Sequence, residues 1–260
     1  MTYKMILGDC MPALRSMPDN SFDAIITDAP YGDINDVERL HEREKYKGGG
    51  IRHLHKGAGD EVNFDWDELL THLVRIARSW IYIFAGDHTG YARSFFNAND
   101  CMTRVGVWEK TNPSPLHGEY IWTSSIELFA IARKRQAKFN RFCASPVLRY
   151  PRGSSLRHPT EKPLGLMREI VESSTRPGDS VLDPFCGTGT TGEACCPDRE
   201  FTGIELEKKY YKLSDRRLSA AWAAAPLFKL SDYYAPASRP PKDVKPELWD
   251  TAEVKNDSDQ

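Results

Sequence analysis

A glycine-rich turn that follows a short apolar segment constrains the fold of this chain more than any other feature. Residues Asp183–Thr191 read Asp-Pro-Phe-Cys-Gly-Thr-Gly-Thr-Thr, and Val181 and Leu182 stand directly before them. Gly187 and Gly189 let the backbone turn tightly and approach a ligand where a Cβ atom would collide. Threonine hydroxyls at the end of the turn can cap a following helix. The pattern predicts a buried strand, a ligand-binding turn and a helix, in that order.

Strand and helix patterns alternate along the rest of the chain. The apolar, β-branched segments that predict strands are Tyr3–Leu7, Phe22–Thr27, Trp80–Phe84, Arg104–Trp108, Ile126–Ala132, Ser180–Asp183 and Phe201–Glu205. The helical patterns are Trp66–Arg78, Leu164–Ser174, Thr190–Cys196 and Lys208–Ala225. This alternation predicts an α/β fold, with a mostly parallel sheet covered by helices on both faces and an antiparallel member near Ile126–Ala132.

The chain has 260 residues, 40% of them hydrophobic, which suffices for one α/β domain over residues 1–225. Residues 32–63 are charged and interrupted by glycines, which is typical of a mobile functional loop. Residues 111–157 are basic and hold scattered prolines, so we interpret them as an insertion that contacts a partner. Residues 226–260 predict a polar, proline-rich C-terminal tail.

Composition favours a soluble, cytoplasmic protein without a metal. No apolar stretch is long enough to span a membrane, and the first residues are not a signal peptide. The six cysteines form no C-x-x-C pair, so we expect reduced, packed thiols and no metal site.

A second motif, Asp28-Ala29-Pro30-Tyr31, follows an apolar strand and precedes the glycine-rich turn along the chain. The two motifs in this order resemble the beta group of DNA amino-methyltransferases, which methylate N6 of adenine or N4 of cytosine. The resemblance implies a Rossmann-like methyltransferase fold with a seven-stranded sheet and a circularly permuted motif order. It also implies S-adenosylmethionine as the methyl donor. The usual family form is Asp-Pro-Pro-Tyr, and this chain departs from it at Ala29.

In such a site the target amine needs acceptors for its N–H groups, because its lone pair is delocalised into the ring. Asp28 can supply a carboxylate and Ala29 a backbone carbonyl. Pro30 stiffens the loop, and Tyr31 can stack on a flipped base, a contact worth about 1–3 kcal/mol. The donor carries its own leaving group, so neither a metal nor a covalent intermediate is required. No cysteine stands in the Pro-Cys pair typical of cytosine C5 chemistry.

The resemblance also implies where the donor binds. The glycine-rich turn would hold its methionine part, Glu205 its ribose hydroxyls, and the Gly8-Asp9 turn its adenine. The segment His158-Pro-Thr-Glu-Lys-Pro163 would meet its carboxylate through Thr160 and Lys162. The residues expected at the donor are Asp9, Cys10, His158, Thr160, Lys162, Asp183, Pro184, Phe185, Gly187, Gly189, Thr190, Thr191 and Glu205.

The net charge of −2 does not indicate nucleic-acid binding, but the distribution of the charged residues along the chain does. From Arg133 to Lys162, nine basic residues stand against the single acidic residue Glu161. Such a stretch can follow a phosphate backbone, so we interpret residues 111–157 as a target-recognition insertion that reads a short or relaxed sequence in double-stranded DNA. The residues expected on DNA are Arg133, Lys134, Arg135, Lys138, Arg141, Arg149 and Arg152.

Several functions remain open on the sequence. Asp28 at the first motif position favours N6 of adenine, because cytosine-N4 enzymes of the family more often have serine there. Cytosine N4 is the alternative within the family, and RNA or protein substrates are further ones. A function of a different class, a catalytically idle DNA-binding module, is suggested only by Ala29. The sequence leaves the oligomeric state open, a homodimer included.

Overall fold

The computed structural model describes residues 2–30, 65–115, 119, 122–135, 137–153 and 161–224. The chain divides into two units, Met1–Ala225 and Pro226–Gln260. The second unit, with the tail expected there, and the loop expected over residues 32–63 lie outside the described residues. The same holds for part of the insertion expected over residues 111–157.

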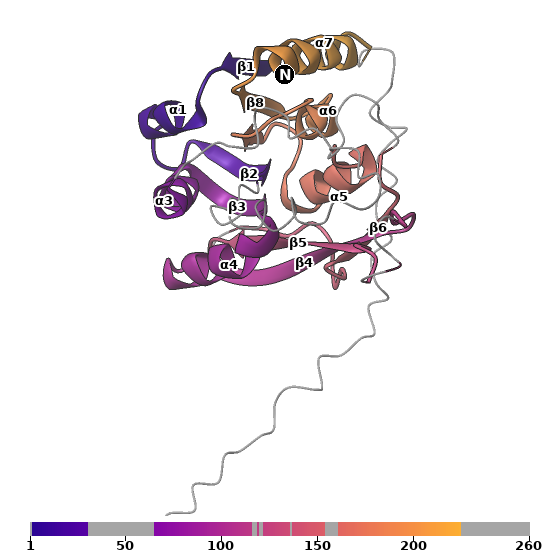
Figure 1. The fold of residues 1–260 in the computed structure, drawn as a ribbon. Coiled ribbons are helices and arrows are strands. Elements are labelled where there is room, and N and C mark those ends of the chain that lie inside the picture. Colours follow the sequence, from indigo (N-terminus) through magenta and orange to yellow (C-terminus); the bar gives the residue numbers. More distant parts are fainter. Residues whose placement is uncertain are drawn as a thin grey trace, which may run out of the picture. The chain divides into compact units, whose positions relative to one another are not determined.

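An eight-stranded sheet forms the centre of the first unit (Figure 1). Its strands are β1 (Tyr3–Leu7), β2 (Phe22–Asp28), β3 (Ala77–Phe84), β4 (Met102–Lys110), β5 (Ile126–Arg133), β6 (Val147–Tyr150), β7 (Ser180–Asp183) and β8 (Glu200–Glu205). Their order is β1-β8-β7-β2-β3-β5-β4-β6, and the seven segments expected to be strands all take part. The eighth strand, β6, pairs in parallel with β4 and was not expected.

The pairing gives the sheet two distinct edges. Only β5 among the described strands is antiparallel to its neighbours, as expected near Ile126–Ala132. All other described strands therefore point the same way. We call the edge where they end the carboxyl edge and the edge where they begin the amino edge. Strand β5 begins at the carboxyl edge and ends at the amino edge.

Helices cover both faces of the sheet (Figure 1). They are α1 (Cys10–Ser16), α3 (Trp66–Ile76), α4 (Thr89–Ala98), α5 (Leu164–Ser174), α6 (Thr190–Cys195) and α7 (Lys208–Ala224), with a short 3-10 helix η1 (Gly86–His88). Adjacent β2 residues point to opposite faces: Ile25 belongs to the core under α1, α3 and α4, and Ile26 to the core under α5, α6 and α7. The alternation of apolar residues along each strand thus produces two cores.

Some element boundaries differ from the sequence-based expectation. The helix expected over Trp66–Arg78 ends at Ile76, because Ala77 adopts an extended backbone and pairs with Phe22 on β2. Helices α1 and α4 were not expected. No helix in the described part of the chain is long and apolar enough to span a membrane.

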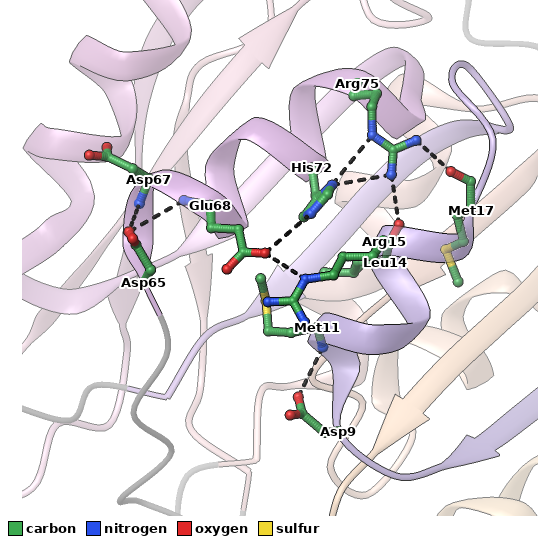
Figure 2. Close-up of polar contacts among 10 residues, drawn as sticks. All are labelled: Asp9, Met11, Leu14, Arg15, Met17, Asp65, Asp67, Glu68, His72 and Arg75. Atoms are coloured by element: carbon green, nitrogen blue, oxygen red, sulfur yellow. Dashed lines mark hydrogen bonds and ion pairs between the residues drawn. The ribbon is translucent and has the colours of Figure 1, made fainter.

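Polar contacts fix α1 against α3 (Figure 2). Asp9 is the N-cap of α1, and its Oδ1 accepts a hydrogen bond from Met11 N at 2.9 Å. Arg75 at the end of α3 donates to the carbonyl of Leu14 at 2.7 Å. An Arg15–Glu68 ion pair of 2.7 Å joins the two helices as well. The Asp9 cap thus lies in the turn between β1 and α1 at the carboxyl edge, whereas Arg75 joins the other ends of the two helices.

Candidate functional site

Three carboxylates gather at the carboxyl edge. Asp28, Asp183 and Glu205 are the last residues of β2, β7 and β8, which lie side by side in the order β8-β7-β2. Parallel strands that end together bring residues far apart in sequence to one place, where α/β proteins bind ligands. The two motifs singled out in the sequence therefore lie on neighbouring strands.

Asp183 holds the glycine-rich turn in shape. Its Oδ1 accepts hydrogen bonds from Thr27 Oγ1 at 2.7 Å and from Phe185 N at 3.1 Å. Its Oδ2 accepts one from Thr191 Oγ1 at 2.6 Å. Burial raises the pKa of Asp183 to about 6, although these hydrogen bonds act in the opposite direction. The carboxylate thus ties β2, the turn and the start of α6 together.

The lack of a side chain has a different structural consequence at each of the two glycines of the turn. Gly189 is the N-cap of α6 with a φ of 85°, and a Cβ there would stand 3.0 Å from Ser214 Cβ on α7. Its missing side chain therefore serves helix packing. Gly187 has a φ of 53°, and a Cβ there would meet no atom within 4 Å. Of these two glycines, Gly187 is the one that borders open space within the described part of the chain, so a ligand could approach the backbone there.

Glu205 lies under the same turn. Its Oε2 accepts a hydrogen bond from Gly187 N at 2.8 Å, and its Oε1 accepts one from Glu207 N at 2.7 Å. Burial raises the pKa of this carboxyl. Gly8 N donates to the Glu205 carbonyl at 2.9 Å, so the Asp9 turn lies next to Glu205. The structure brings the two acidic residues expected near the donor to one corner of the sheet.

Arg217 on α7 also lies at this corner, although no sequence motif predicted it there. Its guanidinium donates to Glu161 Oε1 at 2.8 Å, to the Thr188 carbonyl at 3.2 Å and to Thr190 Oγ1 at 3.1 Å. It also contacts the Glu193 carboxylate. Nothing in the local sequence separates Arg217 from its neighbour Arg216, and its contacts are 24 to 56 residues away along the chain.

At the end of β2, Asp28 forms an ion pair with Lys162. The distance from Asp28 Oδ2 to Lys162 Nζ is 2.6 Å. Ala29 is buried, and its N–H donates to the carbonyl of Phe84 at 3.0 Å. A proline at this position could not make that bond. Where the chain departs from the family form, at Ala29, the structure thus shows a backbone hydrogen bond to β3.

Lys162, which the resemblance assigns to the donor's carboxylate, contacts two carboxylates of the protein itself. Its side chain is only 5% exposed, and its Nζ lies between Asp28 and Glu127 Oε1, the latter at 2.7 Å. Lys110 Nζ in turn lies 3.5 Å from Glu127 Oε2. Neither Glu127 nor Lys110 was expected at the site from the sequence. Tyr31, His158 and Thr160, also expected at the site, lie outside the described residues.

Comparison with known proteins identifies the family. A family model described as DNA methylase (N6_N4_Mtase) matches residues 107–216. The Type II methyltransferase M2.MboI of Moraxella bovis is 30% identical over 244 residues, which are 83% of this chain and 87% of that protein. This chain belongs to the DNA N6/N4 amino-methyltransferase family.

Solved structures confirm the methyltransferase fold expected from the sequence. The M1.HpyAVI–SAM complex has a TM-score of 0.61 and 26% identity, covering 84% of this chain and 99% of that one. The PvuII DNA methyltransferase (cytosine-N4-specific) has a TM-score of 0.60 at 12% identity, covering 88% of this chain and 94% of that one. The second likeness concerns the fold alone.

Burial makes four thiols of this methyltransferase unsuited to nucleophilic chemistry. Burial raises the pKa of Cys10 to about 12 and that of Cys196 to about 11. Burial also raises the pKa values of Cys186 and Cys195 strongly. A thiol with a raised pKa remains protonated at neutral pH and is a poor nucleophile. Cys10 and Cys186 thus serve as packing residues.

The basic stretch of the methyltransferase does not form one surface. Arg133 is the last residue of β5, and Lys134 N donates to the carbonyl of Ser79 at the start of β3, so both lie at the amino edge. Lys138 lies there too, since its carbonyl accepts from Trp80 Nε1 at 3.0 Å. Arg149 and Arg152 instead lie at the end of β6, on the carboxyl edge. The single DNA-binding patch expected from the sequence is thereby corrected to two separate groups.

Within these groups several basic side chains already have partners. Arg133 donates to the Ala137 carbonyl at 2.8 Å, and Lys134 to Asn20 Oδ1 at 3.2 Å. Arg141 forms an ion pair with Glu169 on α5, and Arg149 forms one with Glu109 at 2.9 Å. Arg152 Nε donates to the Asn112 carbonyl at 3.1 Å. Part of the basic stretch therefore serves to pack the segment between β5 and β6 against the rest of the unit.

Proposed function

We propose that this methyltransferase transfers the methyl group of S-adenosylmethionine to N6 of adenine in double-stranded DNA, with the target base flipped out of the helix. The observation that carries the proposal is the juxtaposition of Asp28 and Ala29 with the glycine-rich turn. Strand β2 pairs with β7 through Ala24 and Ile25, so the two motifs end on adjacent strands. An acceptor for an amine and a cradle for a donor are thus side by side.

The glycine-rich corner fits this donor. Gly187 borders open space, and its backbone N–H and the Glu205 carboxylate stand on the same side of the sheet. The donor contributes a methyl group on a sulfonium centre, which needs no further activation. The likeness to the M1.HpyAVI–SAM complex supports the same assignment. Glu205 would receive the ribose hydroxyls, and Asp9 lies in the neighbouring turn.

The Asp28 corner fits the acceptor amine. An exocyclic amine becomes nucleophilic when its N–H groups are held so that the lone pair leaves the ring plane. The Asp28 carboxylate would accept one N–H and the Ala29 carbonyl the other. As the N–C bond forms, the bond from the methyl carbon to the donor sulfur would break, and the positive charge would pass from sulfur to the nitrogen. The fixed Asp28 carboxylate would stabilise this charge until one N–H proton is lost to solvent. Placing the nitrogen in line with the reacting methyl group would supply most of the acceleration.

DNA would approach over the carboxyl edge. A flipped base must reach Asp28, and the exposed Arg149 and Arg152 stand on that edge at the end of β6. Trp122, which precedes β5 on the same edge, is 96% exposed. Arginines contact phosphates and an exposed indole can stack on bases, so this edge presents the chemistry that DNA needs.

Analysis of the methylated product tests the proposal directly. DNA incubated with the enzyme and S-adenosylmethionine is digested to nucleosides, and the products are identified by mass. N6-methyldeoxyadenosine is the expected product. N4-methyldeoxycytidine would replace the adenine assignment with its alternative, and no methylated nucleoside despite DNA binding would indicate an idle module.

A further inference from the structure

We propose that Lys162 positions the amine acceptor Asp28 and does not bind the methyl donor. The inference rests on the proposed role of Asp28. Lys162 Nζ lies 2.6 Å from Asp28 Oδ2 and 2.7 Å from Glu127 Oε1, so two carboxylates engage one ammonium. The side chain is 5% exposed, and Nζ lies 4.9 Å from the centre of the Phe84 ring. Its ammonium is turned toward β2 and β5.

The charge on Lys162 persists in this buried place. Burial alone lowers the pKa of a lysine, but Asp28 and Glu127 raise the pKa of Lys162 above its ordinary value. An ammonium has three donors, and two of them serve the carboxylates here. The donor's carboxylate would have to compete with both of these short contacts. The arrangement therefore favours a fixed structural cation over a ligand for a third carboxylate.

The ion pair connects Asp28 to the rigid part of the sheet. Glu127 lies near the start of β5, and Lys110, 3.5 Å from Glu127 Oε2, is the last residue of β4. Charges alternate along Asp28, Lys162, Glu127 and Lys110, from β2 through β5 to β4. A carboxylate held this way keeps its orientation before the substrate arrives, and small displacements of such a group cost much rate.

Two measurements on Lys162→Met separate the two roles. The affinity for S-adenosylmethionine is measured by calorimetry, and the single-turnover rate is measured with both substrates saturating. A positioning role predicts a rate about 100-fold lower with donor affinity within about twofold of wild type. Donor affinity at least about tenfold weaker, with a near-normal rate at saturating donor, would overturn the proposal.

Further variants guard against misfolding and against a merely structural role. Lys162→Met combined with Glu127→Gln removes one charge of each sign, so it can be measured if the single variant is insoluble. Lys162→Arg keeps a cation and should recover part of the rate. In an Asp28→Asn background, Lys162→Met should cost little further rate, because the group that it positions is gone. Full additivity of the two losses would contradict positioning.

Methyl incorporation is counted from labelled donor, whichever base receives it. Methylated cytosine as the product would therefore overturn the adenine assignment, while the comparison of the Lys162 variants would stand.

Discussion

The two ends of strand β2 each carry an aspartate, and the two are used differently. Asp23 at the amino edge accepts hydrogen bonds from Ser180 N and Ser180 Oγ, both at 2.9 Å, and pairs with Arg78. Burial alone would raise the pKa of Asp23, but these contacts bring it below its ordinary value. Asp28 at the carboxyl edge is paired instead with Lys162, a residue from the segment before α5. Asp23 thus joins two strands, whereas Asp28 stands at the candidate site.

The same contrast extends along both edges. At the amino edge, charged groups fix the loop before β2 to its surroundings: Lys134 after β5 contacts Asn20, and Arg75 on α3 pairs with Asp19. At the carboxyl edge, backbone N–H groups and carboxylates converge on the glycine-rich turn. The type of a residue does not show whether it makes structural contacts or belongs to the candidate site. The direction of its strand does, because it decides at which edge the residue lies. The predictions below compare matched residues on the two edges.

The largest expected difference is between Asp28→Ala and Asp23→Ala. Asp28→Ala should lower methyl transfer by about 10³-fold or more, with donor affinity near normal, because it removes the acceptor of the target amine. Asp23→Ala should leave the rate per folded molecule unchanged and lower the free energy of unfolding by about 1–3 kcal/mol, since Ser180 N–H and Arg78 lose their partner. Turnover assays and urea titrations measure the two quantities. Substantial turnover in Asp28→Ala would count decisively against its role.

A second pair is Gly187→Val and Gly178→Val. Both glycines have positive φ, 53° and 93°, and a Cβ at either would meet no atom within 4 Å. Valine is strained at either φ, so both variants carry a backbone cost, but only Gly187 lies in the proposed donor cradle. We expect Gly187→Val to weaken S-adenosylmethionine binding by about tenfold or more, and Gly178→Val to leave it unchanged. Equal affinities in two folded variants, measured by calorimetry, would remove the cradle from this turn.

The sequence predicts what local pattern determines. The strands, the glycine-rich turn and the position of Asp28 follow from apolar runs and turn residues. Strand β6 was missed because it is four residues long and its pairing with β4 is remote in sequence. Helix α1 was missed because it spans only seven residues and contains Pro12 near its start.

The site was predicted only in part, for the same reason. Glu127 and Arg217 act through partners distant in sequence, and neither stands in a motif. The position of Lys162 depends on two strands that the motif around it does not contain. The basic stretch was read as one patch because its sequence is continuous, whereas β5 and β6 carry its two parts to opposite edges.

The third comparison concerns these two parts. The sequence favours Arg135 and Lys138 as phosphate contacts, but both belong to the segment at the amino edge. We expect the double variant Arg149→Ala and Arg152→Ala to weaken DNA binding uniformly across sequences. The slope of log affinity against log salt should fall by about 2, one for each lost phosphate contact. Arg135→Ala with Lys138→Ala is the matched control and should change neither quantity. The reverse result would place DNA at the amino edge.

The smallest expected effect is at Ala29, where the chain departs from the family form. Its N–H donates to the Phe84 carbonyl at 3.0 Å, and the residue is buried. Ala29→Pro removes this hydrogen bond and leaves a carbonyl without its donor, so the free energy of unfolding should fall by about 1 kcal/mol.

Proline also restricts φ, which stabilises a loop whose native conformation already fits. Ala29→Gly keeps the N–H but loosens the backbone, so it separates the two contributions. If the bond to β3 dominates, Ala29→Pro is the less stable variant and its methyl-transfer rate does not exceed that of the wild type. A proline variant that is both more stable and faster would show instead that ring rigidity, and not the backbone bond to Phe84, is what the acceptor loop requires.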